Sequence, residues 1–333
     1  MRKIVVKQPG GLENLLVVEQ EMPEPGVGEV RVRWRASSLN YHDYLVAIGA
    51  IPVAQDRVPM SDGAGDIDAV GEGVSNWKVG DKVMSMFFPD WFAGRASLES
   101  PTVISGETVD GYAAEYSCVS AQSLTSIPDD YSYTQAATLP CAALTAWRAL
   151  VPVGQLKAGD SVLVQGSGGV SLFALQFAKS MGAYVYATTS SDEKSQRMRA
   201  LGADEVVNYK TDEKWGRTLA KMSGGGIDHI LDVGGPSTLT QSVDAVAMSG
   251  QVTLIGILGG RAAEVVLPKL FFKHASLNGI AVGSREMQND MIKSINISGL
   301  KPVIDKSFQL DQVKQAFEYQ VSGAHMGKIV LEY

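Results

Sequence analysis

Hydrophobic and polar positions alternate with a period of two along much of the first 125 residues. The alternation is clear at Glu29–Trp34, and strand-like runs also occur at Ile67–Val74 and Asp81–Met86. Glycine and proline break these runs into short pieces, which is typical of all-β domains. We therefore expect residues 1–125 to form a barrel-like β domain.

The periodicity changes near Thr134, where a helical spacing of apolar residues begins and continues to Val151. Beyond it, short apolar runs alternate with helical segments. The runs are Ser161–Gln165, Ala183–Thr188, Glu205–Asn208, His229–Val233, Gln251–Ile255 and Ser276–Val282. This alternation predicts an α/β fold, with a doubly wound parallel sheet of the Rossmann type over residues 126–282.

The last segment, residues 283–333, is expected to return to the β domain and complete it. It predicts a helix at Met287–Ser298, a strand at Ser307–Leu310, a helix at Asp311–Ser322 capped by Asp311, and a strand at Lys328–Glu332. A chain of 333 residues is long enough for two such domains.

Composition narrows the function classes. A net charge of −7 and a pI near 5.2 argue against a nucleic-acid partner. We find no apolar stretch of membrane-spanning length and no secretory signal at the N-terminus, so we expect no membrane partner. Two cysteines, Cys118 and Cys141, make neither a disulfide framework nor a four-cysteine zinc site, which favours a cytoplasmic protein.

The most informative stretch is a glycine-rich turn between a buried strand and an apolar helix. It comprises Gly166, Ser167, Gly168, Gly169 and Val170. Glycines in this context let backbone N–H groups approach a pyrophosphate at the positive end of the following helix. The turn therefore predicts a dinucleotide site.

The end of the second strand predicts which dinucleotide binds. An NAD site usually places a carboxylate there, whereas this strand ends in Thr189 and Ser190, with Lys194 following. Hydroxyls and a cation suit a 2′-phosphate. Asp192 and Glu193 are interpreted as first-turn residues of the next helix, so we expect NADPH.

Several short motifs together resemble the medium-chain dehydrogenase/reductase superfamily. They are Ala69–Val74, Lys78–Val83, Leu201–Asp204, Ile255–Gly259 and Gly327–Leu331. The resemblance covers essentially the whole chain. It implies a GroES-like β-barrel domain beside the Rossmann domain, and a homodimer formed by edge pairing of the cofactor sheets near Ser276–Val282.

The zinc ligands of that superfamily's alcohol dehydrogenases are a cysteine, a histidine and a second cysteine. The matching positions here hold Asn40, Ser61 and Cys141. One thiolate cannot hold a zinc ion that needs three protein ligands, and His42 with Asp62 is a poor substitute set. We therefore expect no metal, and the chain resembles the zinc-independent quinone oxidoreductases.

Without zinc, the natural acceptor is a conjugated one. Hydride added to a quinone or an enone gives a delocalised anion that needs no Lewis acid. We predict an NADPH-dependent oxidoreductase acting on a small hydrophobic or aromatic conjugated substrate. The alternatives are an enoyl-thioester reductase, an alcohol dehydrogenase-like protein, or an NADPH-binding protein with little turnover.

The resemblance also implies individual roles. Asn40 would face the nicotinamide ribose or the substrate, Thr145 would pack against the nicotinamide, and Tyr209 would lie beside adenosine and its phosphate. Backbone contacts to the nicotinamide end would come from Ile255, Gly256, Ile257, Ala281, Val282 and Gly283.

Other side chains carry open alternatives. Lys328 either approaches the cofactor or is a surface lysine. Tyr41, Tyr44 and His42 adjoin Asn40 and are candidate proton donors; the alternatives are cleft lining for the tyrosines and a surface position for His42. In the divergent loop Phe87–Gly111, Trp91 and Phe92 either stack on a flat substrate or pack inside the protein.

Overall fold

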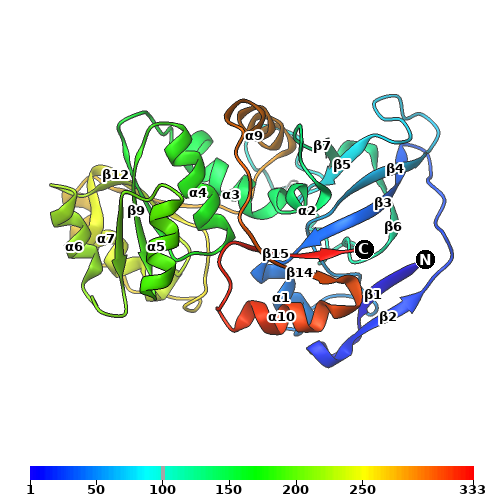
Figure 1. Cartoon of the computed structure of the whole chain (residues 1–333), viewed down its shortest axis with the longest axis horizontal. Helices are drawn as coiled ribbons and strands as arrows, with labels where there is room; N and C mark the ends of the chain where they lie inside the picture. The colour runs from blue at the N-terminus through cyan, green and yellow to red at the C-terminus, as the bar shows by residue number, and fades with distance from the viewer. Residues whose placement is uncertain (99–101) are drawn as a thin grey trace. The chain divides into compact units, whose positions relative to one another are not determined.

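The computed structural model describes residues 1–98 and 102–333; residues 99–101, inside the predicted loop Phe87–Gly111, lie outside the described residues. The chain divides into two compact units (Figure 1). The first unit comprises Met1–Leu144 and Val282–Tyr333, and the second comprises Thr145–Ala281. Both ends of the chain therefore belong to the first unit.

The first unit is built on β-strands, as the alternating pattern predicts. An antiparallel hairpin joins β1 (Arg2–Val6) and β2 (Leu15–Glu19). A seven-stranded sheet follows the order β14 (Ile304–Gln309), β15 (Lys328–Glu332), β3 (Glu29–Ser38), β4 (Ala64–Val70), β5 (Lys82–Ser85) and β7 (Leu124–Ser126), with β6 (Tyr116–Ser120) paired to β3. Along β3, Val30, Val32 and Trp34 are buried in one cluster, which explains the period of two.

The helices of the first unit are α1 (Tyr41–Ala47), α2 (Tyr133–Ala136), α9 (Arg285–Ser298) and α10 (Val313–Val321). A π-helical stretch, Leu139–Ala143, follows α2. The predicted cap at Asp311 is wrong: Asp311 lies inside a 3-10 turn, Leu310–Gln312, and the reciprocal cap is made by Gln309 and Gln312.

The second domain begins later than the predicted residue 126. Residues 126–144 belong to the first unit. The physical reason is that this segment is bonded to first-unit residues: the Tyr131 hydroxyl donates to the Leu300 carbonyl, and the Tyr133 hydroxyl donates to Asp66 on β4. At the other end, the boundary between Ala281 and Val282 agrees with the prediction to within one residue.

The second unit holds the predicted six-stranded parallel sheet. Its order is β10 (Glu205–Asn208), β9 (Tyr184–Thr189), β8 (Ser161–Gln165), β11 (Ile227–Asp232), β12 (Val246–Leu254) and β13 (Ser276–Gly279). The helices are α3 (Leu144–Arg148), α4 (Gly169–Ser180), α5 (Asp192–Ala200), α6 (Trp215–Met222), α7 (Leu239–Ala245) and α8 (Leu267–Phe272), with a π-helical stretch at Ala149–Val153. Trp215 and Leu219 of α6 pack with Leu239 and Val243 of α7 against the sheet.

One helical stretch corrects the expectation that no apolar run reaches membrane-spanning length. Tyr133–Val153, 21 residues long, has the length and hydropathy of a span. However, 72% of its apolar window is buried inside the protein, as in the core helices of globular domains.

Candidate active site

Asp43 of α1 joins two segments of the first unit. The backbone N–H of Asn40, at the N-terminus of α1, donates to Oδ2 of Asp43 at 2.9 Å, and the N–H of Ser61 donates to Oδ1 at 2.8 Å. Asp43 is buried, so the carboxylate fixes both segments in place. This agrees with the structural role expected of a residue three positions into a helix.

Around Asp43 lies a buried polar cluster, which we call the Lys328 cluster, formed by Asn40, Ser61, Asp62 and Lys328. The Nζ of Lys328 donates to Oδ1 of Asn40 at 2.6 Å and to the Leu39 carbonyl at 2.7 Å. The amide Nδ2 of Asn40 donates to Oδ2 of Asp62 at 2.9 Å and to Oγ of Ser61 at 3.2 Å. Lys328 is only 4% exposed, so its interpretation as a surface lysine is wrong.

Asp62 is the least satisfied member of the Lys328 cluster. It is fully buried, and burial raises its pKa to about 7 although Lys328, at 3.9 Å, lowers it. Its Oδ1 atom has no hydrogen-bond partner among the described residues. In the sequence, Asp62 is only a poor candidate zinc ligand, and nothing there indicates that it meets Asn40 and Lys328.

The residues of this cluster do not fit a catalytic zinc. The Asn40 amide presents hydrogen-bond donors to Ser61 and Asp62, while its oxygen already accepts from a buried ammonium. Burial raises the pKa of the Cys141 thiol well above its usual range, and Asp62 raises it further. Within residues 1–98 and 102–333, no group of three His, Cys, Asp or Glu side chains is arranged to hold a metal.

His42 is partly buried in the first unit, with a side chain that is 19% exposed, and is not the fully exposed surface residue that one sequence alternative predicts. Its Nε2 is 2.7 Å from Oε2 of Glu107, and its Nδ1 is 3.6 Å from Oδ1 of Asp43. Burial lowers the pKa of His42, but the two carboxylates outweigh burial and raise it. Glu107 had no signal in the sequence, because nothing indicates where its loop folds back.

The glycine-rich turn of the second unit has the form that a pyrophosphate needs. Gly166 has φ 71°, in the left-handed region that favours glycine. A Cβ added at Gly166 or Gly168 would meet no described atom within 4 Å, so the surface of the turn is open. Gly168 is the N-cap of α4, which has twelve residues, and it has no side chain that could cap the helix. The first backbone N–H groups of α4, those of Gly169 and Val170, therefore have no side-chain cap.

The end of β9 holds the residues expected to select the dinucleotide. Thr189 is buried, and its hydroxyl has no partner in the part of the chain that the structure describes. Its carbonyl accepts from the backbone N–H of Tyr209, so Tyr209 lies directly beside it. Ser190 follows, and Ser191 caps α5 by accepting from the N–H of Lys194.

The acidic residues after β9 are placed as predicted. Asp192 and Glu193 form the first turn of α5. The Asp192 carboxylate accepts from Nδ2 of Asn208 at 3.1 Å. The structure therefore brings Thr189, Ser190 and Tyr209 together at the end of β9, with Lys194 one turn into α5.

The remaining predicted positions lie in both units. Thr145 is buried in α3, and Ile255, Gly256 and Ile257 directly follow β12. Ala281 closes the second unit and accepts from the Arg148 guanidinium at 2.9 Å. Val282 and Gly283 belong to the first unit; Val282 has φ 42°, which is rare for a β-branched residue and typical of functional sites when it occurs.

The aromatic candidates are mostly packing residues. Tyr44 packs against Phe317 of the first-unit core, and its role as a proton donor stays a prediction. Trp91 is 1% exposed and so packs inside the protein. Phe92 is 42% exposed and lies under the guanidinium of Arg285 at 5.0 Å.

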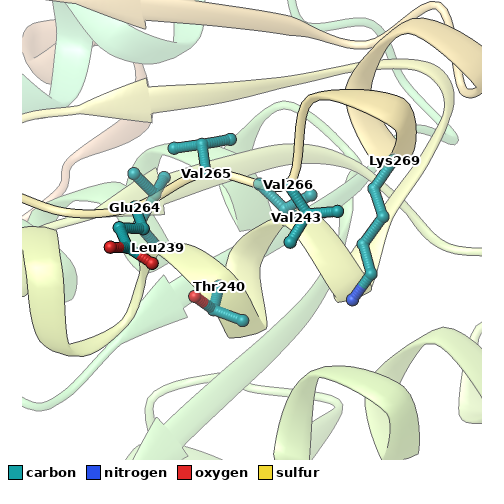
Figure 2. Close-up of a pocket in the computed structure, with 7 residues that line it drawn as sticks. All are labelled: Leu239, Thr240, Val243, Glu264, Val265, Val266 and Lys269. Carbon is teal, nitrogen blue, oxygen red and sulfur yellow. The ribbon is translucent and has the colours of Figure 1, made fainter.

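A small surface pocket lies elsewhere in the second unit, between α7 and the segment that leads into α8 (Figure 2). It is lined by Leu239, Thr240, Val243, Glu264, Val265, Val266 and Lys269. Its empty volume of about 190 Å³ includes open solvent, so the pocket is a shallow depression that does not enclose a ligand. It contains no predicted site residue, so we assign no cofactor or substrate to it.

Comparison with protein families gives two matches. Residues 26–129 match an alcohol dehydrogenase GroES-like domain, and residues 169–296 match a zinc-binding dehydrogenase domain. The chain is 40% identical to a zinc-type alcohol dehydrogenase-like protein of Schizosaccharomyces pombe over 342 residues, covering 100% of this chain and 99% of that protein.

Two further relatives have other names. A chloroplastic quinone oxidoreductase of Triphysaria versicolor is 31% identical to this chain, and the match covers 97% of this chain and 95% of that protein. An acryloyl-coenzyme A reductase of Sulfurisphaera tokodaii is 27% identical, with both chains covered completely.

Solved structures agree with both domains. An NAD-dependent alcohol dehydrogenase superposes with a TM-score of 0.92 at 32% identity, with both chains covered completely. A mycobacterial protein complexed with NADPH gives a TM-score of 0.84 at 27% identity over the full length of both chains. Since residues 26–129 and 169–296 match two dehydrogenase domains and a relative covered over 99% of its length is 40% identical, this chain is an oxidoreductase that belongs to the medium-chain dehydrogenase/reductase family.

Proposed function

We propose that this chain is a zinc-free, NADPH-dependent oxidoreductase that reduces conjugated acceptors, either quinones or enones. The observation that carries the proposal is the Lys328 cluster. The Asn40 amide, at the position that resembles the first zinc-ligand position of the alcohol dehydrogenases, is hydrogen-bonded to the Lys328 ammonium and to the Asp62 carboxylate. Since a conjugated acceptor delocalises the charge that hydride brings, its reduction needs no Lewis acid.

The names of two relatives support a conjugated acceptor. One is a quinone oxidoreductase, and the other is an acryloyl-coenzyme A reductase, whose substrate carries a C=C bond next to a thioester carbonyl. The second name favours an enoyl thioester as the alternative substrate class. The two classes share the same hydride chemistry.

When bound, the reduced nicotinamide would supply the hydride. The chain's own contribution is binding and orientation. The N–H groups at Gly169 and Val170 would hold the pyrophosphate at the N-terminus of α4, and Thr189 would give its unpartnered hydroxyl to the adenosine end. The Lys328 cluster would keep Asn40 in one orientation beside the reacting groups.

NADPH is favoured over NADH by the surroundings of Thr189. Lys194 lies in the first turn of α5, five residues after Thr189. The Asp192 carboxylate in the same turn accepts a hydrogen bond from Asn208. Replacing Lys194 with Ala should raise the KM for NADPH about tenfold, because one charge-assisted contact to the 2′-phosphate is lost. The KM for NADH should stay unchanged. Lys221→Ala, an exposed lysine in the last turn of α6, is the matched control.

The test of the proposed function is NADPH oxidation with a panel of quinones, enones, enoyl thioesters, ketones and aldehydes. We expect turnover with quinones or enones and little with simple aldehydes. Faster turnover of enoyl thioesters would select the alternative substrate class. Tight NADPH binding without oxidation by any acceptor would refute the proposal and leave a binding protein.

We also propose that the chain forms a homodimer through the second unit. Strand β13 pairs with β12 and, within the described residues, leaves its other edge open. Near it in sequence, large apolar side chains are exposed: Ile257, Leu258, Val266, Leu267, Phe271, Phe272 and Leu277. An open edge beside exposed apolar side chains suits a second copy, which would bury both.

Light scattering after gel filtration tests the dimer. The wild type should elute as a dimer, and Phe272→Asp, which places a charge at a side chain that is 72% exposed, should weaken it. Phe92→Asp, exposed in the first unit, should leave the dimer intact. A monomeric wild type, or an unaffected Phe272→Asp dimer, would contradict the assignment.

A further inference from the structure

The order of the strands in the second unit reverses between β8 and β11. From β8 the sheet continues to β9 and β10 on one side, and from β11 it continues to β12 and β13 on the other. In open parallel sheets, ligands bind beyond the carboxyl ends of the strands at such a reversal, because the connections that follow the two strands part there. The residues that end these two strands are Gln165, directly before the glycine-rich turn, and Asp232.

The carboxylate of Asp232 is fully buried and accepts hydrogen bonds from the loop and the helix that follow it. Its Oδ1 accepts from the N–H of Gly235 at 2.8 Å and from the hydroxyl of Thr238 at 2.6 Å. Its Oδ2 accepts from the hydroxyl of Ser242, in α7, at 2.6 Å. The same hydroxyl oxygen accepts from Nε2 of Gln165 at 2.7 Å, so the end of β8 is joined to the group. Water cannot replace these partners at a buried carboxylate.

The loop after β11 supports the segment after β12. The N–H of Ile255 donates to the backbone carbonyl of Asp232 at 2.9 Å. One residue further, the two backbones are so close that a Cβ on Gly256 would lie 2.3 Å from the carbonyl oxygen of Val233. The position of the segment after β12 is therefore set by the loop that the Asp232 carboxylate holds.

We propose that Asp232 is a positioning residue for the nicotinamide half of the dinucleotide. The inference rests on the proposed function, with Ile255–Ile257 as the expected contact to the nicotinamide end. Since Asp232 is fully buried, it acts through the two loops and not by contact with the cofactor. Its bonded partner Gln165 adjoins the glycine-rich turn, which would hold the pyrophosphate. Asp232 thus fixes the nicotinamide contacts relative to the pyrophosphate contacts.

The adenosine end of the site is built on different elements. Thr189 ends β9, Tyr209 follows β10, and Lys194 lies in α5, all beyond β8 from the loops that Asp232 holds. Loss of the Asp232 carboxylate should therefore misplace one half of the site and spare the other. This asymmetry separates positioning of the cofactor from general destabilisation of the second unit, which would weaken both halves.

Calorimetry with two ligands tests the asymmetry without turnover. Asp232→Asn keeps the shape of the side chain but turns one acceptor oxygen into a donor that faces other donors. Its Kd for NADPH should rise about tenfold, whereas its Kd for adenosine 2′,5′-bisphosphate, the adenosine end alone, should stay within about twofold of wild type. Asp228→Asn is the matched control, because that carboxylate accepts from the N–H and hydroxyl of Ser161 at the opposite end of β11. It should keep both affinities.

Turnover with the best acceptor from the panel gives a second readout. Asp232→Asn should raise the KM for NADPH and lower kcat, each about tenfold, because a displacement of about 1 Å can cost up to about 100-fold in rate. Thr238→Val and Ser242→Ala each remove one hydroxyl that donates to the carboxylate and leave the carboxylate in place. They should show the same pattern at smaller size, and they carry the test if Asp232→Asn does not fold.

Two results in the folded variants would overturn the inference. Equal loss of affinity for NADPH and for adenosine 2′,5′-bisphosphate would mean that Asp232 supports the second unit as a whole. Unchanged affinity for both would mean that the cofactor does not depend on the loops that Asp232 holds. A wild type that binds NADPH but reduces no acceptor would refute the proposed function alone, and a wild type that binds neither ligand would refute both.

Discussion

Removing the ammonium of Lys328 should destabilise the first unit more than any loss of surface charge could. Lys328→Met keeps the length of the side chain but leaves three groups without their donor or counter-charge: the Asn40 oxygen, the Leu39 carbonyl and the Asp62 carboxylate. All of them lie in the protein interior, where water cannot replace the lysine.

The geometry sets the size of the effect. Two unit charges 3.9 Å apart interact by about 4 kcal/mol at an effective dielectric constant of about 20. Breaking a buried pair from one side typically costs about 3–5 kcal/mol, so we expect a loss of about 4 kcal/mol at pH 8. Near pH 6 the loss should be smaller, because Asp62, with its pKa raised to about 7, is then mostly neutral.

Hydrogen exchange measured by mass spectrometry suits a chain of two units, because it reports each unit separately. Peptides from β3 and β15 should exchange roughly a thousand-fold faster in Lys328→Met at pH 8, while β8 and β9 serve as internal reference. Lys314→Met, at an exposed position of α10, should change little.

A double variant completes the test. Adding Asp62→Asn to Lys328→Met removes the uncompensated carboxylate and should recover at least half of the lost free energy. A loss below about 1 kcal/mol at pH 8, or a loss that does not shrink at pH 6, would refute the interpretation of Lys328 as the counter-charge of a buried carboxylate.

Two further predictions test other parts of the site. Gly111→Ala would place a Cβ 2.6 Å from the Pro59 carbonyl oxygen and also against the Met60 carbonyl. Urea unfolding should therefore show a free energy of unfolding lower by about 3 kcal/mol. The control Gly28→Ala, at a glycine with open space around it, should lower it less. Thr189→Val removes a buried hydroxyl that has no partner among the described residues. It should raise the thermal stability of the cofactor-free protein by about 1 kcal/mol and weaken NADPH binding several-fold by calorimetry, whereas weaker stability with unchanged binding would contradict the assigned contact.

Local patterns were sufficient to predict the architecture. Alternating residues in β3 and the six apolar runs of the second unit each reflect burial on a sheet, so their positions hold to within a few residues, apart from β12, which starts five residues early. The boundary at residue 126 was missed because the decisive contacts, such as Tyr131 with the Leu300 carbonyl, join segments 169 residues apart.

The site was only partly predictable for the same reason. The glycine turn at Gly166 carries a local signal, whereas the Lys328 cluster is assembled from segments near residues 40, 62 and 328. No local pattern indicates that Lys328, the first residue of a strand, is buried, or that Glu107 lies against His42 in the folded protein. Such groupings become visible only when the fold brings the segments together.

The central claim is reduction of a conjugated acceptor without zinc, and metal analysis of the active protein tests it most directly. Purified protein should contain less than about 0.1 zinc per chain, and NADPH oxidation with the best quinone or enone should be unchanged after dialysis against a chelator. One zinc per chain, with activity lost on chelation and restored by zinc, would contradict the account.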